Sequence, residues 1–203
     1  MRSRLVIVAT GTANLASVLA AFRRLGADPA LARVPEMVES AQQVVLPGVG
    51  SFGAAMCELD RTGMREVLAR RVAEARPTVA ICVGMQLLAG TSEESEEVAG
   101  LAGIDVAVRR FPVTVRVPQL GWNEVRAGPG CTHLSDGWAY FANSYRLADV
   151  PAGWSVAVSD HGGEFVAGME RGGILACQFH PELSGSWGSS ILASWLDVTA
   201  RAA

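Results

Sequence analysis

The sequence has no lysine, only three histidines and no long apolar run, and each shortage narrows what the protein can be. Its seventeen basic residues are all arginines and are outnumbered by twenty acidic residues, which gives a formal net charge of −3. Nucleic-acid-binding domains usually carry an excess of basic residues, which this chain does not have, so we expect no nucleic-acid partner. No apolar stretch approaches the roughly 18 residues of a membrane span, and the run at residues 5–9 is too short for a secretory signal peptide. We therefore expect a cytoplasmic protein without a membrane contact.

Cysteine is also scarce and shows no metal-binding or disulfide pattern. The four residues include no C-x-x-C pair: Cys57, Cys82, Cys131 and Cys177. With 203 residues and a hydrophobic content of 50%, the chain has enough core to fold without disulfides. We expect reduced thiols, no bound metal or cofactor, and a single domain over residues 1–203.

Apolar runs that alternate with helical spacing predict an α/β arrangement in the first half of the chain. Residues 5–9 and 44–46 are rich in β-branched side chains, as in strands that are buried on both faces. Helices are expected at about 15–25, 54–59 and 64–75, with a less regular strand–helix unit over 27–41. The acidic segment at residues 92–97 is expected to be a solvated surface loop.

From residue 104 the pattern changes to short strands separated by turns and glycines. These strands are predicted at 105–109, 113–117, 123–126, 138–141, 154–159 and 164–170. A last buried strand at 174–179 and an amphipathic helix at 188–198 follow them. We predict an α/β fold with a mostly parallel open sheet flanked by helices and an antiparallel extension in the C-terminal half.

The segment from Arg76 to Leu88 has the pattern of a strand, a sharp turn and a helix, with Cys82 at the turn. It is the thiol counterpart of the nucleophile elbow G-x-S-x-G, with Ala80 in the place of the first glycine. A side chain at such a turn is exposed at the carboxyl edge of the sheet, and the N-terminus of the following helix favours a thiolate. Cys82 is therefore a candidate nucleophile, although a lone cysteine of this kind is more often a buried structural residue.

Three glycines after the strand at 44–46 spell G-x-G-x-x-G, at Gly48, Gly50 and Gly53. We reject a dinucleotide-binding role, because that motif follows the first strand and needs an acidic residue about 20 positions later at the end of the next strand. Here residues 66–75 are predicted to be helical. The loop still exposes backbone N–H groups, which can bind an oxyanion or a phosphate.

The strand at 174–179 leads directly into His180-Pro181-Glu182. Pro181 favours an extended His180, so the imidazole and the carboxylate two residues later can project to the same side. A carboxylate beside an imidazole fixes its tautomer and stabilises the imidazolium. With Cys82 and the glycine loop, the set contains the nucleophile, base, orienting carboxylate and oxyanion donors for acyl transfer through a thioester. The remaining histidines lie in turn-rich segments and are expected to face solvent: His133 and His161.

These motifs are similar to those of the class I glutamine amidotransferases, and nearly the whole chain resembles the glutaminase subunits of imidazole glycerol phosphate synthases. The segments that match the class are at 47–56, 82–88 and 178–182. The segments that point to the glutaminase subunits are at 10–18, 117–125 and 140–145, of which Gly121-Trp122-Asn123 is the most specific. The resemblance implies the flavodoxin-like fold of the class.

The resemblance also implies a chemistry, namely hydrolysis of glutamine to glutamate and ammonia. Cys82 would be the nucleophile, His180 the base and acid, and Glu182 the orienting residue. The oxyanion hole and the pocket for the glutamine head group would be formed by Val49, Gly50, Val83, Gln86, Ser144 and Tyr145. The ammonia would pass to a partner cyclase with a (β/α)8 barrel, which forms imidazole glycerol phosphate and AICAR from PRFAR in histidine biosynthesis.

By the same resemblance, the mouth of the active site faces the cyclase, with which the chain would form a heterodimer. The residues implied on that side are Asn14, Trp122, Tyr140, Leu183 and Trp187. Leu183 and Trp187 can offer only apolar contact and one N–H donor, so we expect a more hydrophobic interface than is usual in the family. The alternative for Trp187 is packing under the C-terminal helix, where it would face Ile191 at helical spacing.

The chain also departs from the family pattern, and the departures keep two other interpretations open. Ala9 stands where the family usually has Asp, Ala80 where it has Gly, and Leu183 where it has Lys or Arg. Gln119 and Asn143 replace residues that are commonly His. One alternative is a paralogous glutaminase that feeds ammonia to a different synthase, such as one that makes a nitrogen-containing sugar or a secondary metabolite. Another is a non-catalytic binding subunit, against which the intact triad argues.

Overall fold

The centre of the molecule is a mixed β-sheet. The computed structural model describes residues 5–10 and 14–201, and within them nine strands form this sheet in the order β2-β1-β3-β4-β12-β11-β10-β7-β8. The strands are β1 (Leu5–Val8), β2 (Ala30–Ala32), β3 (Gln43–Gly48), β4 (Thr78–Cys82), β7 (Gln119–Ala127), β8 (Gly137–Asn143), β10 (Ser155–Asp160), β11 (Glu164–Arg171) and β12 (Ile174–Cys177). From β2 to β12 neighbouring strands are parallel, and from β12 to β8 they are antiparallel. The predicted α/β fold with an antiparallel extension is confirmed.

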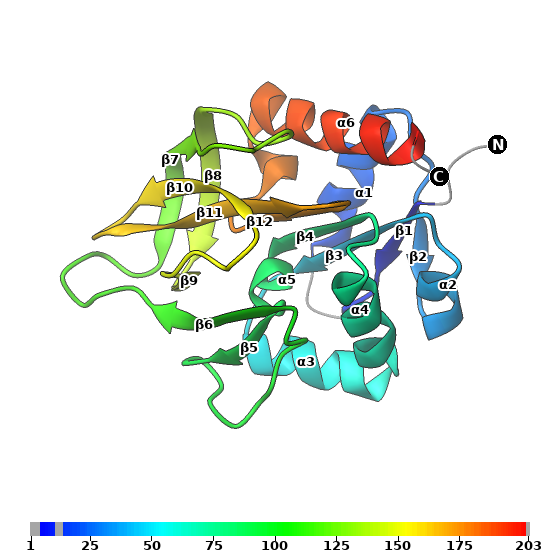
Figure 1. Cartoon of the computed structure of the whole chain (residues 1–203), viewed down its shortest axis with the longest axis horizontal. Helices are drawn as coiled ribbons and strands as arrows, with labels where there is room; N and C mark the ends of the chain where they lie inside the picture. Colours follow the sequence, from blue (N-terminus) through cyan, green and yellow to red (C-terminus); the bar gives the residue numbers. More distant parts are fainter. Residues whose placement is uncertain (1–4, 11–13, 202–203) are drawn as a thin grey trace.

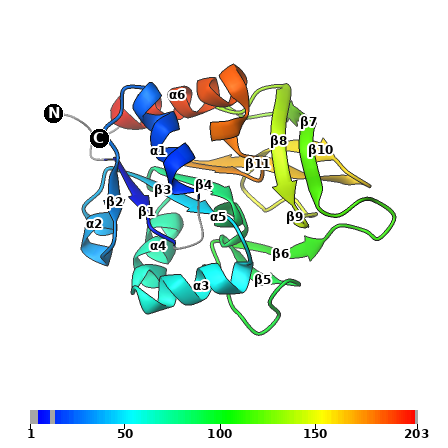
Figure 2. The same ribbon diagram turned by 180° about the vertical axis from the view of Figure 1, so that it is seen from behind.

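Helices cover both faces of the parallel half (Figure 1). α1 (Leu15–Arg24) and α6 (Gly185–Arg201) lie on one face and α3 (Phe52–Arg61) and α4 (Met64–Ala73) on the other, as Figure 2 shows from behind. The short α2 (Pro35–Glu39) lies near β2. Because both faces are covered, every residue of β1, β3 and β4 is buried, which explains their uninterrupted apolar runs. Among the described residues, no helix combines the length and apolar character that a membrane crossing requires.

A smaller sheet follows the nucleophile elbow. α5 (Val83–Gln86) has only four residues, and the chain then forms β5 (Ala89–Ser92), which pairs with β6 (Ile104–Arg110), while β6 pairs with β9 (Tyr145–Leu147). The sequence does not predict β5 or β9, because the first reads Ala-Gly-Thr-Ser and the second has three residues. The predicted strand at 113–117 is wrong. This segment is a turn in which Val113 is 97% exposed, and Pro112 and Pro118, which cannot donate to a strand ladder, bound it.

The antiparallel half curls back and reaches the residues that follow β12. β8 is last in the sheet order, yet His180 N donates to Tyr140 O of β8 at 2.9 Å. Tyr140 N also donates to Ser184 Oγ at 3.0 Å, just after the 3₁₀ turn η1 (Pro181–Leu183). The antiparallel half therefore folds back on the open sheet, and β8 lies near the residues that follow β12.

Two of the histidines are less exposed than expected. His133 is buried, and its Nδ1 lies 2.9 Å from Ser194 Oγ of α6, so the prediction that it faces solvent is wrong. His161 is half-buried, with Nε2 at 2.8 Å from Arg116 O. The two histidines therefore fasten turns to neighbouring elements, which leaves His180 as the candidate base.

Trp187, in the first turn of α6, is half-buried against the core. Its ring centroid lies 5.2 Å from that of Phe179, and its Nε1–H donates to Asp136 O at 3.0 Å. The indole also fills the space over Gly137, where a Cβ would overlap it. These contacts favour the packing alternative over an interface role for Trp187. Of the other predicted turn and interface positions, residues 11–13 lie outside the described residues, and Asn14 is the exposed N-cap of α1.

Candidate active site

Cys82 ends β4 in a backbone conformation that a tight turn imposes. Its φ of 55° and ψ of −112° are unusual for a residue with a side chain, and such conformations cost about 1–3 kcal/mol. Glycines make the turn possible, because a Cβ on Gly84 would overlap Leu46 O and one on Gly48 would lie 2.8 Å from Gly84 N. The first glycine of the G-x-G-x-x-G pattern thus lets β3 approach the elbow. The predicted strand–turn–helix geometry around Cys82 is present, with α5 beginning at the next residue.

His180 and Glu182 lie beside Cys82 because β12 pairs with β4 in parallel register. Cys177 is opposite Ile81, so the two strands end at the same edge of the sheet. β4 ends there with Cys82, and β12 is followed there by His180. His180 is extended (φ −97°, ψ 94°), as the following proline predicts, and its Nδ1 lies 2.8 Å from Glu182 Oε1. The imidazole and the carboxylate are nearly shielded from solvent, with side-chain exposures of 7% and 3%.

The surroundings of His180 favour its charged form. Burial alone lowers the pKa of an imidazole, but hydrogen bonds and charge interactions with Cys82 and Glu182 outweigh burial and raise the pKa of His180 to about 10. The imidazole is then protonated near neutral pH, with a carboxylate on Nδ1 and the sulfur as its other partner. A protonated imidazole next to a cysteine favours the nucleophilic thiolate.

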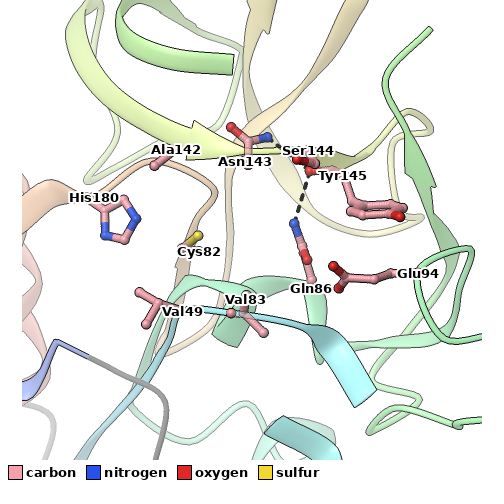
Figure 3. Close-up of a pocket in the computed structure, with 11 residues that line it drawn as sticks. Val49, Cys82, Val83, Gln86, Glu94, Ala142, Asn143, Ser144, Tyr145 and His180 are labelled. Carbon is pink, nitrogen blue, oxygen red and sulfur yellow. Dashed lines mark hydrogen bonds between the residues drawn. The ribbon is translucent and has the colours of Figure 1, made fainter. Parts of the chain in front are cut away.

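Cys82 and His180 line a cavity of about 200 Å³ (Figure 3). The residues that line it come from the loop after β3, the elbow, the loop after β5, the junction of β8 and β9, and the residue before η1: Val49, Gly50, Cys82, Val83, Gln86, Glu94, Ala142, Asn143, Ser144, Tyr145 and His180. Of the residues predicted for catalysis and substrate binding, all but Glu182 line this cavity. Glu182 does not line it but is hydrogen-bonded to His180, which does. The hydrogen bonds that join Tyr140 of β8 to His180 and Ser184 hold β8 beside the segment after β12 and so bring residues 142–145 to the cavity.

Gln86 is held through its amide nitrogen. Nε2 donates to Tyr145 O at 3.0 Å and to Gln178 Oε1 at 2.9 Å, so both of its hydrogens are used. Asn143 Nδ2 donates to the same Tyr145 O at 3.0 Å, as the dashed lines in Figure 3 indicate. The atom that Gln86 still offers is Oε1, which can only accept. Gln86 therefore suits a ligand with N–H donors, such as an amino group.

Glu94 and Ser95 belong to the site region but are not predicted by the sequence. Phe52 N donates to Glu94 Oε2 at 2.6 Å, and Gly53 N donates to Ser95 Oγ at 3.1 Å. These bonds fasten the N-terminus of α3, where a negative charge is favoured, directly after the glycine loop. The expectation of a plainly solvated loop at 92–97 is therefore wrong for these two residues, and also for Ser92, which is buried and ends β5. The partners of Glu94 and Ser95 lie 42 residues away in the sequence, so no local pattern indicates the contact.

The whole arrangement has the parts of a thiol-dependent acyl-transfer site, and comparison with known proteins identifies its class. A model of the class-I glutamine amidotransferase family matches residues 6–197, and the chain belongs to that family. Its curated relatives narrow the assignment. It is 39% identical over 197 residues to imidazole glycerol phosphate synthase subunit HisH of Symbiobacterium thermophilum, with 95% of this chain and 93% of the relative covered. It is 38% identical over 197 residues to the HisH subunit of Methanothermobacter thermautotrophicus, with 96% and 98% covered.

Solved structures agree with this fold. A crystal structure of a glutamine amidotransferase matches with a TM-score of 0.78 at 20% sequence identity, covering 96% of this chain and 98% of the other. PurLQS from Thermotoga maritima matches with a TM-score of 0.74 at 16% identity, covering 98% of this chain and 99% of that chain. At these identities the matches concern the fold alone.

Proposed function

We propose that the chain is the glutaminase subunit of an imidazole glycerol phosphate synthase. It hydrolyses glutamine to glutamate and ammonia and supplies the ammonia to a (β/α)8-barrel cyclase, which forms imidazole glycerol phosphate and AICAR from PRFAR. The observation that carries the proposal is the triad: a cysteine at a strained elbow, and beside it an imidazole whose Nδ1 lies 2.8 Å from a buried carboxylate. The similarity to HisH subunits supports the choice of synthase.

Each group has a role in the proposed hydrolysis. The Cys82 thiolate attacks the carboxamide carbon of glutamine, and the oxyanion that forms is stabilised by the Val83 N–H and the loop at Gly50. His180 gives its proton to the amide nitrogen, so that ammonia leaves and a thioester remains on Cys82. His180 then takes a proton from a water molecule, and the resulting hydroxide attacks the thioester. Glutamate leaves and the thiolate is restored.

Glu182→Gln is expected to slow this hydrolysis without abolishing it. In serine-protease triads the corresponding change lowers turnover by roughly 10⁴-fold, and a thiol paired with a protonated imidazole needs less help, so we expect a smaller loss here. Glu182 also helps to raise the pKa of His180. Its removal should lower that pKa and move the alkaline limit of activity to lower pH, because His180 must be protonated to release ammonia.

Rates of glutamate formation across the neutral and alkaline range check this expectation. Glu164→Gln, a change of a surface carboxylate in β11, serves as the control and should leave the pH profile unchanged. A loss in Glu182→Gln as complete as the loss in Cys82→Ala would show that Glu182 does more than orient the imidazole.

An exposed apolar surface lies next to the active site on β7 and β8. Trp122 is opposite Tyr140 in this strand pair, and their rings meet edge to face with centroids 6.3 Å apart. We define the docking surface by Leu120, Trp122, Trp138, Tyr140 and Leu183, of which Leu120, Trp122 and Trp138 are 64%, 55% and 59% exposed. Gathered apolar side chains of this kind mark interaction sites. Ala142, opposite Leu120, continues the same face into the cavity, so a cyclase bound here would receive ammonia at the mouth of the site.

The proposal is tested by measuring glutamate and ammonia from glutamine, for the chain alone and with the barrel subunit of the synthase and PRFAR. We expect imidazole glycerol phosphate to form from glutamine only when both subunits are present. Glutamate release with no imidazole glycerol phosphate, while the same barrel subunit works with ammonium salts, would assign the chain to a different synthase. The apolar Leu183 at the docking surface is the feature that favours this second candidate. The absence of glutamate release in every mixture would refute the glutaminase assignment.

A further inference from the structure

Gln178 links the candidate nucleophile to the wall of the cavity through buried amides. It is completely buried and follows β12, so the parallel register that places Cys177 opposite Ile81 also places Gln178 beside Cys82. Gln178 Nε2 lies 3.8 Å from Cys82 Sγ, and Gln178 Oε1 accepts from Gln86 Nε2 at 2.9 Å. The hydrolysis described above gives Gln178 no role.

One backbone carbonyl determines the direction of every bond in this chain of amides. Tyr145 O can only accept, so the atom of Gln86 that faces it must be Nε2. The second hydrogen of that nitrogen is directed at Gln178, which must therefore present its oxygen to Gln86 and its nitrogen to the sulfur. A reversed Gln178 would set two amide nitrogens, both donors, against each other. The fold thus holds an N–H donor against Cys82 Sγ.

We propose that Gln178 is a positioning residue for the Cys82 thiolate, which it holds by one N–H donor while its oxygen ties the same side chain to Gln86 and the Tyr145 carbonyl. An N–H directed at a negative sulfur stabilises it, and more strongly in a buried site than in water. This inference rests on the proposed function, in which Cys82 is the nucleophile. Besides Cys82 itself, the titratable groups of the cavity are His180 with its partner Glu182, Glu94 from the loop after β5, and Tyr145, and all four remain in the variants below.

Gln178→Glu removes the donor and keeps the acceptor. One carboxylate oxygen can still accept from Gln86, whereas the other sets a negative acceptor against the sulfur. The pH at which iodoacetamide alkylates Cys82 at half its maximal rate should rise by about one unit, which corresponds to about tenfold slower alkylation at pH values well below that midpoint. Because Gln86 stays in place, kcat for glutamine should fall while KM changes little. Gln178→Met removes both bonds, so in that variant KM should rise as well.

Gln43→Met is the matched control for Gln178→Met. Gln43 is also a completely buried glutamine, and its Nε2 donates to Thr199 Oγ1 of α6, but it lies at the opposite end of β3 from Gly48, which pairs with Cys82. This variant should melt at a lower temperature without any shift of the alkylation profile. An unchanged profile in both folded Gln178 variants would overturn the proposal, and so would an equal shift in Gln43→Met. Alkylation needs no glutamine, so the two proposals can fail separately. If the wild-type chain releases no ammonia but the Gln178 variants show the expected shifts, the proposed function is refuted and the role of Gln178 is still supported.

Discussion

Cys82→Ala is expected to abolish the release of glutamate and ammonia from glutamine, because in the proposed mechanism the thioester forms on its sulfur. Serine-protease triads that lose a member keep only the roughly 10³–10⁴-fold acceleration over water that binding and the oxyanion hole provide, which a standard glutaminase assay does not detect. In the wild-type chain, an electrophile that mimics glutamine should modify Cys82 alone. Mass mapping of the modified peptides measures this directly.

The other cysteines act as internal controls in that experiment. Burial raises the pKa of the Cys131 thiol and raises that of Cys177 well above its ordinary value, so both should stay unmodified. Cys57 is exposed on α3 and tests whether exposure alone is enough for reaction. If any of these three is modified before Cys82, the assignment of the nucleophile fails.

Trp122→Ala is expected to weaken binding of the cyclase by about 2 kcal/mol or more, or roughly 30-fold in Kd. The indole is a large exposed side chain at the centre of the docking surface, and its loss also leaves Tyr140 without its edge-to-face partner. Synthesis from glutamine should fall in the mixture of subunits, whereas synthesis from ammonium salts, which bypasses this chain, should be spared. Calorimetric titration of one subunit into the other measures the affinity.

Trp187→Ala is the control for this experiment, because it removes an indole of the same size from the adjacent helix. It loses the contact with Phe179 and the hydrogen bond to Asp136 O, so its melting temperature should fall while its affinity for the cyclase stays the same. Equal affinity losses in the two variants, or none in Trp122→Ala, would show that the docking surface is placed wrongly.

Local patterns were enough to predict the elements that present the candidate nucleophile and the candidate base. The apolar runs of β1 and β3 are buried on both faces, and the turn at Cys82 needs Gly84 because Leu46 O lies against it. The extended His180 follows from Pro181. Each of these features depends on sterics within a few residues, and the family resemblance then indicates that the elements meet.

The contacts that the sequence does not reveal join residues far apart in the chain. Gln178 and Cys82 are 96 positions apart, and their contact depends on the register of β12 with β4. From the sequence, Glu94 is one more residue of an acidic loop; the structure shows that the N-terminus of α3 lies against its carboxylate. The burial of His133 depends in the same way on α6, whose position no pattern near residue 133 encodes.

The insertion of β12 between β4 and β11 has a consequence for synthesis on the ribosome. Cys82 emerges long before the segment that supplies its base, and until β12 emerges, the edge of β4 that it will pair with is open. One event, the docking of β12, therefore closes that edge and delivers Gln178, His180 and Glu182 to the thiol. If Cys82 and His180 act as proposed, a nascent chain should not hydrolyse glutamine before β12 has docked, so the acquisition of activity should report completion of the sheet.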